Sequence, residues 1–314
     1  MNKRRRVLVT GGCGFIGSHL VDSLVESGIE VVIVDNLRTG KIEFLNPHAL
    51  YFNNDINSLD NLSDCLEEGI DEVYHLAANA DVRDGWADPW RDVDSNLLTS
   101  LKLIEFCVNK GVKNFIFAST GSVYGEAVSL PTREDSPILQ QTSLYAASKF
   151  STESFLGAYA KAEKIRVHIF RLVSVLGSRY THGHVYDFVK KLKIDPNHLQ
   201  VLGNGNQTKS YVSIHDCVKA LKGLRGSQPF EIFNIGTNET FSVKQSLGII
   251  LNMLGLNPNL EFGSAESGWI GDNPKILLDI EKARSFGWSP MIPIREALEE
   301  TVDWLSENDW VFSK

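Results

Sequence analysis

The sequence contains few features of secreted, membrane-spanning or disulfide-bonded proteins. Its four cysteines lie far apart and form no C-x-x-C pair, which is typical of a reducing compartment where cysteines serve as small apolar side chains. No uncharged apolar run is long enough to span a bilayer. Glycines interrupt the apolar run that follows the basic residues 3–6. We therefore expect no signal peptide and a cytoplasmic protein.

Clustered metal ligands and excess positive charge are also missing. The eight histidines are scattered, and the one close pair, His182 and His184, has no carboxylate or cysteine cluster in its sequence neighbourhood. We therefore expect no metal site. The net charge of −8 argues against a general nucleic-acid binder, which usually has a basic face. A local basic pocket for an anionic small molecule stays open.

The residues that are present predict a large α/β fold. A chain of 314 residues, 43% of them hydrophobic, is long enough to bury a substantial core. Short β-branched runs alternate with amphipathic stretches in its first half. The strand-like runs cover 6–10, 31–34, 72–77, 114–119 and 166–172, and the helix-like stretches cover 15–27, 93–110 and 145–163. This alternation predicts a Rossmann-type, doubly wound parallel sheet with helices on both faces.

The composition of the sequence changes after about residue 173. Loops lengthen, and glycine, asparagine and proline become frequent in the segments 177–184, 202–210 and 263–275. We predict two parts: a sheet domain, 1–173 with 210–238 returning to it, and a smaller C-terminal region, 174–209 and 239–314. Ligands of open α/β sheets bind at the carboxyl ends of the strands.

A glycine-rich loop follows the first predicted strand. Gly11, Gly14 and Gly17 have the spacing G-x-x-G-x-x-G and lead into the first helix. Glycines there let the backbone turn tightly and approach a pyrophosphate, which the N–H groups of the helix N-terminus bind. The same pattern could be only a tight turn with close helix packing, but the order of strand, loop and helix favours a dinucleotide site.

An acid follows this loop at the expected distance. Asp35 ends the second predicted strand, 18 residues after Gly17. An acid about 20 residues beyond the loop hydrogen-bonds the adenosine ribose hydroxyls, and its charge repels the 2′-phosphate of NADP. Arg38 could instead favour that phosphate. Because Asp35 itself holds the strand-end position, we expect NAD.

Tyr145 and Lys149 form a Y-x-x-x-K pair on the third predicted helix. Residues four apart share one face of a helix. A tyrosine acts as a base near neutral pH only if its pKa falls by about two or three units from about 10. We expect the Lys149 ammonium and a bound nicotinamide cation to lower it. Thr120, directly after the fourth of these strands, brings a hydroxyl to the same edge of the sheet. The bland alternative is an ordinary helix surface with an aromatic ring and a charge.

Together these segments resemble the extended short-chain dehydrogenase/reductase superfamily. They are TGGCGFIGSHLV (10–21), VDN (34–36), HLAANADVR (75–83), ASTGSVYGE (118–126), LYAASK (144–149) and LGNGNQTKSYVSIHDCVKA (202–220). The resemblance covers about residues 5–305 and is strongest to the branch of UDP-glucose (UDP-galactose) 4-epimerases in the NAD-dependent epimerase/dehydratase family. It implies that the sheet domain binds NAD and the C-terminal region binds a nucleotide-sugar.

The resemblance also implies the roles of individual residues. It makes Tyr145 the base, with Thr120 and Lys149 as its catalytic partners, in a reaction through a transient 4-keto sugar. The family's NAD contacts fall on Gly11, Gly14, Phe15, Ile16, Gly17, Asp35, Asn36, Asp55, Ile56, Leu76, Ala77, Ala78, Asn96, Tyr145, Lys149 and Val173. Its substrate contacts fall on Arg83, Ser122, Ser174, Arg179, Lys209, Tyr211 and Ile276.

Several positions depart from the family pattern. Ser174 stands where epimerases commonly have asparagine, and Lys209 where many relatives have an arginine that can pair bidentately with a phosphate. A second phosphate-binding arginine is absent from the segment 267–274. Ile276 is expected beside the sugar, where a large aromatic residue would restrict the site, so N-acetylated UDP-hexoses are expected substrates too.

The segment before Tyr124 distinguishes the branches of the superfamily. Sugar 4,6-dehydratases and UDP-glucuronate decarboxylases usually carry a glutamate or an acid pair where this chain has Gly121 and Ser122. The segment therefore favours epimerisation or reduction. A non-catalytic NAD(P) sensor is a remote alternative, because such relatives typically lose the tyrosine or the lysine.

We also expect a homodimer. The stretches 93–110 and 145–163 carry apolar residues beyond one helical stripe: Leu97, Leu98, Leu101, Ile104 and Val108 on the first, and Phe150, Phe155, Leu156 and Tyr159 on the second. Two such helices per subunit could pair into a four-helix bundle, as in the family. The alternative is that all of this surface packs on the sheet.

Overall fold

The structure, a computed structural model, describes residues 5–58, 69–80, 82, 84–163, 165–268, 271, 273 and 275–313. The chain divides into two compact units. The first comprises 1–123, 144–171 and 218–233, and the second 124–143, 172–217 and 234–314. The boundaries expected from the sequence differ from this division mainly at 124–143 and 210–217, which belong to the second unit.

The first unit is built on a seven-stranded sheet with the order β11-β6-β5-β4-β1-β2-β3. Its strands are β1 (Arg6–Thr10), β2 (Glu30–Asp35), β3 (Leu50–Asn53), β4 (Glu72–His75), β5 (Asn114–Thr120), β6 (Arg166–Leu172) and β11 (Phe230–Ile235). Neighbouring strands from β3 to β5 run parallel. The strand order reverses between β1 and β4, and open α/β sheets bind ligands at such a switch point. The predicted fold class is confirmed.

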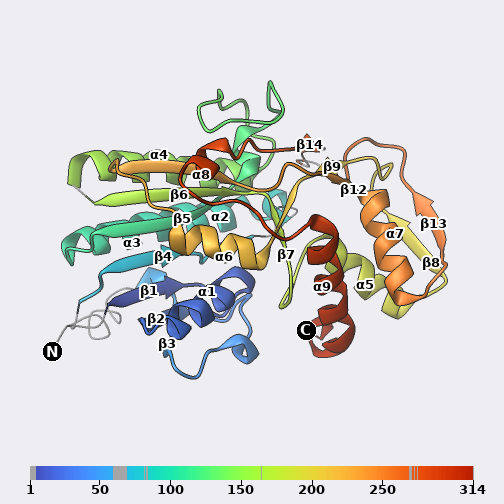
Figure 1. Ribbon diagram of the computed structural model, residues 1–314, viewed down its shortest axis with the longest axis horizontal. Coiled ribbons are helices and arrows are strands. Elements are labelled where there is room, and N and C mark those ends of the chain that lie inside the picture. Colours follow the sequence, from blue (N-terminus) through green and yellow to red (C-terminus); the bar gives the residue numbers. More distant parts are fainter. Residues whose placement is uncertain are drawn as a thin grey trace. The chain divides into compact units, whose positions relative to one another are not determined.

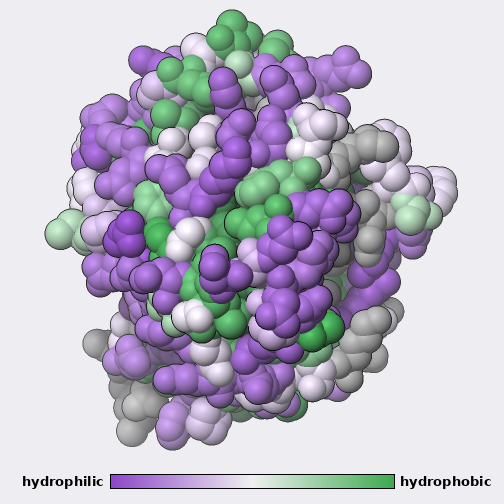
Figure 2. All heavy atoms as spheres, turned by 90° about the vertical axis from the view of Figure 1, so that its right-hand side faces the viewer, coloured by the Kyte–Doolittle hydropathy of each residue, from purple (hydrophilic) through white to green (hydrophobic). Residues whose placement is uncertain are grey.

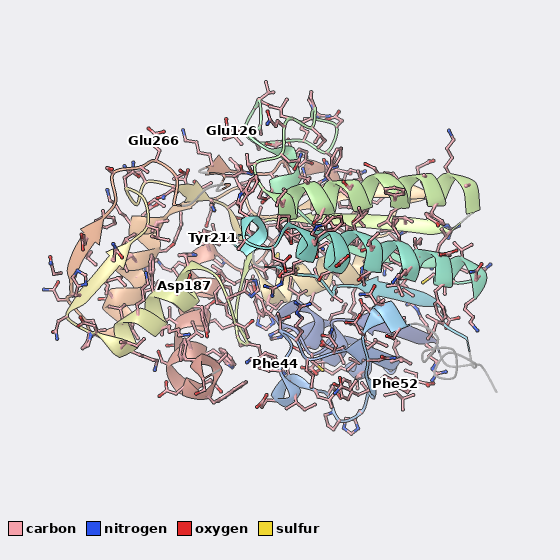
Figure 3. All side chains as sticks on the ribbon, turned by 180° about the vertical axis from the view of Figure 1, so that it is seen from behind. Phe44, Phe52, Glu126, Asp187, Tyr211 and Glu266 are labelled. Carbon is pink, nitrogen blue, oxygen red and sulfur yellow. The ribbon has the colours of Figure 1, made fainter. Side chains whose placement is uncertain are left out.

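Helices cover both faces of this sheet, as Figures 1 and 3 show from opposite sides. One face carries α1 (Phe15–Glu26) and α6 (Ile214–Gly223), and the other α3 (Thr99–Asn109) and α4 (Leu144–Glu163). The strands read as nearly continuous apolar runs because helices bury both of their faces. Leu8, Val32, Val73, Phe115 and Phe117 are fully buried within one core cluster, which fixes the edge where the strands end.

The predicted helix 93–110 is not one regular α-helix. The short helices η4 (Asp84–Trp86) and α2 (Pro89–Asp92) lead into a π-helical segment, η5 (Val93–Leu98), before α3 begins. Both α2 and η5 pack against α4. Such π-helical turns are rare and often occur at functional sites. This one brings the buried polar side chain of Asn96 to α4.

The second unit is built from small sheets and amphipathic helices. Its strands are β7 (Ser174–Leu176), β8 (His198–Val201), β9 (Thr208–Lys209), β10 (Tyr211–Ser213), β12 (Phe241–Ser242), β13 (Asn259–Phe262) and β14 (Lys275–Ile276). Its helices are α5 (His184–Ile194), α7 (Val243–Leu254), α8 (Glu281–Ser285) and α9 (Ile294–Glu307), with the 3-10 turn η7 (Asp309–Phe312). The side of this unit that carries α7, β8 and β13 is largely hydrophilic around a smaller hydrophobic area (Figure 2).

Local sequence explains where α7 begins and ends. Ser242 accepts a hydrogen bond from the Gln245 backbone while the Gln245 side chain accepts one from the Ser242 backbone, which is a capping box. Gly255 ends the helix in the left-handed conformation, with φ of 65°, which glycine adopts without steric cost.

Candidate active site

The glycine-rich loop has no room for side chains at two of its three glycines. Gly11 has φ of +72°, and a Cβ there would lie 2.7 Å from Ala77 N. A Cβ on Gly17 would lie 2.0 Å from Gly11 O. Gly14 is the N-cap of α1 and offers no side chain to cap it. The loop therefore packs tightly against the end of β4 and presents the N-terminus of α1 to an anion.

Asp35 is held in place at the end of β2. Its side chain is buried, and its carboxylate accepts hydrogen bonds from Cys13 N at 2.9 Å and Leu37 N at 2.8 Å. Burial raises the pKa of Asp35, and the two backbone N–H groups partly oppose this rise. A Cβ on Gly40 would lie 2.9 Å from both carboxylate oxygens. The oriented acceptor oxygens fit ribose hydroxyls, and they disfavour a phosphate at that place.

The other predicted cofactor residues in the first unit lie at the ends of strands or in the helices beside them. Asn36 donates to Asp55 Oδ2 at 2.9 Å. Leu76, Ala77 and Ala78 follow β4, Phe15 and Ile16 begin α1, and Ile56 is buried after β3. Val173 is the exception, because it belongs to the second unit.

Asn96 is buried on η5, and its side chain already binds protein groups. Its Oδ1 accepts from Asn79 N at 2.8 Å, and its Nδ2 donates to Ser148 Oγ at 3.0 Å. These bonds show that Asn96 positions the neighbouring segments. A contact between Asn96 and NAD stays a prediction.

The three predicted catalytic residues all belong to the first unit. Thr120 ends β5, and its Oγ1 accepts a hydrogen bond from Ser122 N at 3.1 Å. Tyr145 lies in the first turn of α4, one turn before Lys149. Lys149 is almost fully buried, and its Nζ donates to Ala118 O at 3.0 Å. The fold thus directs the lysine toward the strand that ends at the threonine.

The electrostatics of this pair differ from the expectation. Burial, and then the charge of Asp92, raise the pKa of Tyr145. Burial lowers the pKa of Lys149 to about 8, although Glu153 and Asp92 oppose this shift. The expected lowering of the Tyr145 pKa is therefore wrong for the protein by itself, because burial destabilises the phenolate and the Asp92 charge adds to this effect. A cation bound beside Tyr145 is needed to lower it.

Sequence reasoning missed a buried ion pair behind the reactive lysine. Arg171 on β6 donates to both carboxylate oxygens of Glu153 on α4, with the shortest distance 2.6 Å. Ser119 on β5 also donates to Glu153. Glu153 follows Lys149 by four residues, and this spacing was the one signal in the sequence that the two share a helix face.

The predicted substrate residues of the second unit lie on its small sheets or just after β7. Ser174 and Tyr211 are register partners of β7 and β10, and Lys209 and Ile276 of β9 and β14. Tyr211 is labelled in Figure 3. Arg179 has φ of 61°, an uncommon conformation for a side chain with a Cβ. Arg83 lies outside the described residues, and Ser122 lies in the first unit just after β5.

His184 packs beside these residues as a neutral side chain. Its ring lies 5.5 Å from the Tyr211 ring. Burial lowers the pKa of His184 to about 4, and the nearby Lys209 charge adds to this effect. The histidine is therefore neutral at physiological pH. It packs among these side chains, and the charge there comes from Lys209.

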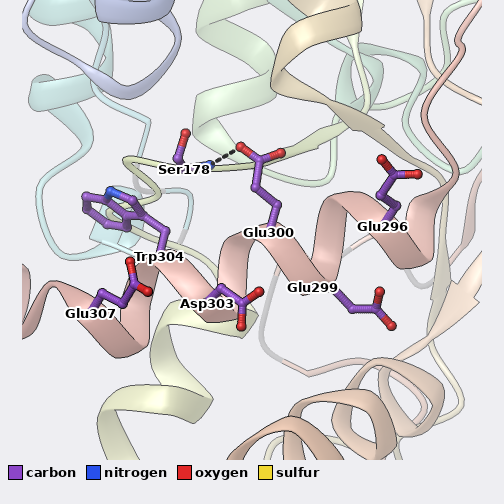
Figure 4. Close-up of a pocket in the computed structure, with 7 residues that line it drawn as sticks. All are labelled: Ser178, Glu296, Glu299, Glu300, Asp303, Trp304 and Glu307. Atoms are coloured by element: carbon purple, nitrogen blue, oxygen red, sulfur yellow. Dashed lines mark hydrogen bonds between the residues drawn. The ribbon is translucent and has the colours of Figure 1, made fainter.

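A separate cavity in the second unit has the wrong charge for a nucleotide-sugar. It is lined by Ser178, Glu296, Glu299, Glu300, Asp303, Trp304 and Glu307, all but Ser178 from α9 (Figure 4). Glu300 accepts hydrogen bonds from Ser178 N at 3.1 Å and interacts with His215 Nε2 at 3.2 Å. Five carboxylates repel a diphosphate, so this cavity is not a candidate substrate site.

Within the described residues, no three histidine, cysteine or carboxylate side chains are grouped so that they could hold a metal ion. His182 stacks on Tyr180, with the ring centroids 6.1 Å apart. Among the residues that the structure describes, no helix is long and apolar enough to cross a membrane.

Known proteins resemble this chain over nearly its whole length. The model of the "NAD dependent epimerase/dehydratase family" matches residues 7–236. A Methanocaldococcus jannaschii protein described as "Putative UDP-glucose 4-epimerase" is 35% identical over 309 residues, 96% of this chain and 99% of its own length. UDP-glucuronic acid decarboxylase 1 of Danio rerio is 29% identical over 96% of this chain and 73% of its own.

Solved structures also resemble this chain over nearly its whole length. A UDP-galactose 4-epimerase has a TM-score of 0.89 at 34% identity, covering 97% of this chain and 100% of its own. The UDP-glucose 4-epimerase of Thermus thermophilus, solved in complex with NAD, has a TM-score of 0.86 at 32% identity, covering 96% and 99%. The glycine cradle that a Cβ would fill and the oriented Asp35 carboxylate fit this cofactor.

Proposed function

Because the chain belongs to the NAD-dependent epimerase/dehydratase family, we propose that it interconverts the C4 epimers of a UDP-hexose, with UDP-glucose and UDP-galactose as the first candidates. NAD is the cofactor of this family. The observation that carries the proposal is the arrangement of Thr120, Tyr145 and Lys149 on β5 and α4 of the first unit. A base, a buried cation and a hydroxyl at one sheet edge are what alcohol oxidation at C4 requires.

The roles of these residues follow from their chemistry. The glycine-rich loop and Asp35 would hold NAD, which would supply the acceptor for the C4 hydride and its return to the other face of the 4-keto sugar. Tyr145 Oη removes the proton of the sugar 4-hydroxyl as the 4-keto sugar forms, and gives it back when the hydroxyl is restored. The Lys149 ammonium stabilises the phenolate, and the Thr120 hydroxyl hydrogen-bonds the reacting oxygen.

The segment after β5 favours epimerisation over the other reactions of the family. Gly121 and Ser122 offer no carboxyl group, and Ser122 N donates to Thr120 Oγ1. Elimination across C5 and C6 requires an acid and a base at those carbons. Neither Gly121 nor Ser122 can act as such an acid or base. This favours reduction of the 4-keto sugar over elimination.

The second unit supplies the residues proposed for the nucleotide-sugar. Arg179 and Lys209 provide positive charge for the diphosphate, while Ser174 and Tyr211 offer hydroxyl groups. Ile276 is the proposed wall beside the sugar, and it permits N-acetylated forms because isoleucine is smaller than tyrosine. Arg83 is a further proposed substrate contact.

We also infer a homodimer formed by η5, α3 and α4. Ile104 and Leu156 pack in the core of the first unit, so they do not belong to such an interface. Leu98 and Phe155 are 40% and 48% exposed, and Leu97, Leu101, Val108, Phe150 and Tyr159 are partly exposed. A second copy of the chain would bury this apolar surface.

The proposal is tested by incubating the purified protein with single UDP-sugars and no added NAD. The panel contains UDP-glucose, UDP-galactose, their N-acetylated forms and UDP-glucuronate, and the products are separated and identified. We expect the C4 epimer of at least one UDP-hexose. Release of carbon dioxide from UDP-glucuronate, or a 4-keto-6-deoxy product, would instead assign the chain to a decarboxylase or a dehydratase.

A further inference from the structure

A buried carboxylate outside the predicted site lies close to the reactive helix. Asp92, the last residue of α2, is fully buried. Its Oδ1 accepts a hydrogen bond from Asn79 Nδ2 at 2.8 Å and a longer one from Asn96 Nδ2 at 3.4 Å. A carboxylate without solvent contact is stabilised as an ion by such donors. The two amides therefore hold a negative charge at a fixed place.

This carboxylate lies directly beside Gly85. A Cβ built on Gly85 would lie 2.7 Å from Asp92 Oδ2 and 3.5 Å from the Cβ of Leu144. Leu144 is the first residue of α4. Since the same small volume touches both groups, the Asp92 carboxylate lies within a few ångströms of the first turn of α4, which also contains Tyr145.

Hydrogen bonds connect the segment around Asp92 to that turn. Asn96 Nδ2 donates to Ser148 Oγ at 3.0 Å, and Ser148 Oγ donates to Tyr145 O at 2.8 Å. Thr152 Oγ1 donates to Asn96 O at 3.1 Å. The carboxylate, the π-helical segment and the reactive turn of α4 therefore form one buried polar network, whose parts cannot move independently.

Few other charges face this network. On α4 itself, Glu153 is paired with Arg171 of β6. On β4, burial lowers the pKa of His75 to about 3, so this side chain is neutral. The remaining titratable groups of the described elements packed on α4 lie on α2, η5 and α3. Arg91 on α2 is partly exposed, while Asp94 on η5 and Lys102 and Glu105 on α3 are exposed. Cys107 on α3 is buried, and burial raises the pKa of its thiol, so it carries no charge.

We propose that Asp92 is a positioning residue of the reaction, which acts through its fixed negative charge on Tyr145 and Lys149 and through the amides that join it to α4. The inference rests on the proposed acid–base role of Tyr145. The charge keeps Lys149 as an ammonium ion and keeps the proton on Tyr145 until substrate and cofactor are bound. A proton acceptor thus forms only in the assembled complex.

The sign of the effect is the same for both groups. A negative charge stabilises the protonated form of any neighbour, and Asp92 raises the pKa values of both Tyr145 and Lys149. Replacing Asp92 with asparagine removes the charge and keeps an oxygen that can accept from Asn79. Both limbs of a bell-shaped pH profile should then move to lower pH together, by about half a unit or more.

The test measures kcat against pH for the NAD-bound enzyme with UDP-galactose, in the wild type and in Asp92→Asn. The matched control is Asp94→Asn, which removes the same charge from an exposed side chain two residues away. We expect the Asp92→Asn profile to move down in pH and the control profile to stay. An unmoved profile with a lower kcat would overturn the proposal, because it would assign Asp92 a merely structural role.

A second measurement does not depend on turnover. The ultraviolet absorbance of the phenolate is titrated in the NAD-bound protein, and the contribution of Tyr145 is taken as the difference from Tyr145→Phe. This titration should occur at lower pH in the Asp92→Asn background. If it moves while no UDP-sugar reacts, the proposed function fails and the inference stands; if UDP-sugars react and it does not move, the inference alone fails.

The smaller neutral variant Asp92→Ser guards against a defect specific to asparagine, and it should displace the profile in the same direction. Folding is followed by far-ultraviolet circular dichroism and by retention of NAD. Failure of both variants to fold would contradict the proposal, because a side chain whose role is to position Tyr145 and Lys149 is dispensable for folding.

Discussion

The Lys149 ammonium lies 4.6 Å from the centroid of the Phe117 ring. It is held there by its hydrogen bond to Ala118 O and by its position one turn after Tyr145. The ring face stabilises the cation, although burial destabilises it more, since the pKa of Lys149 falls to about 8. At neutral pH this buried lysine is charged, which lowers the stability of the folded state. The loss of stability can be measured, because it disappears when Lys149 releases its proton at higher pH.

We predict that Lys149→Met changes the pH dependence of stability. Above the folded-state pKa of about 8, the folded protein releases the proton that the lysine of the unfolded chain keeps up to its ordinary pKa of 10.5. The wild type should therefore gain about 2 to 4 kcal/mol relative to Lys149→Met as the pH rises through this window. Urea unfolding of both proteins at neutral and at alkaline pH measures this difference.

The control for this prediction is Lys102→Met, since Lys102 is an exposed lysine on α3. Its stability relative to the wild type should stay constant over the same pH range. A difference for Lys149→Met that is equally constant would show that the lysine is as well solvated in the folded protein as in the unfolded chain.

We predict that Tyr145→Phe abolishes turnover while NAD still binds. The variant removes the proposed base and keeps the ring that packs in the first turn of α4. Losses of two to four powers of ten are expected when such a group is removed. Turnover of UDP-galactose and retained NAD are measured together. Tyr186→Phe, which removes a hydroxyl that donates to Val311 O in the second unit, should remain active. A Tyr145→Phe enzyme within tenfold of wild type would sink the assignment.

We predict that light scattering gives a mass of about 70 kDa, twice the 35.0 kDa of the chain. The variants Leu98→Lys and Phe155→Lys place charges in the proposed interface and should shift the mass toward that of one chain. Met291→Lys, at a residue 74% exposed in the second unit, should leave it unchanged. A wild-type mass of 35 kDa at micromolar concentration would contradict the dimer.

We predict that Ile276→Tyr lowers the rate with UDP-N-acetylglucosamine much more than with UDP-glucose. A larger ring at this position of β14 should collide with the N-acetyl group and spare a hydroxyl. A difference in fit of one methyl-sized group is worth only about 1–3 kcal/mol, so the preference should be graded. Equal losses with both substrates, or none, would show that Ile276 does not limit the sugar.

The sequence predicted the architecture of the first unit because its strands are buried on both faces. Continuous β-branched runs such as 6–10 and 31–34 leave little choice of element. Strand β3 went unpredicted since its four residues are partly or fully exposed and give no apolar run. The π-helical segment η5 was also missed, because its apolar periodicity resembles that of an α-helix and its hydrogen-bond pattern depends on packing against α4.

The residues of the candidate site could be predicted only where a fixed spacing along the chain is typical of a chemical function. Gly11, Gly17 and Asp35 follow from a spacing along the chain, and so does the pair of Tyr145 and Lys149. Asp92 could not be found this way. A carboxylate in a short polar segment normally indicates a solvated surface, and only the fold shows that Asn79 and Gly85 enclose it.

The fate of the hydrogen at C4 tests the central claim most directly. UDP-glucose carrying deuterium at C4 is converted without added NAD, and the UDP-galactose formed is analysed by mass spectrometry and proton NMR. The account predicts that the deuterium remains at C4 of the product, because one hydride leaves and returns within the same site. Loss of the deuterium to water, or uptake of solvent hydrogen at C5, would contradict it.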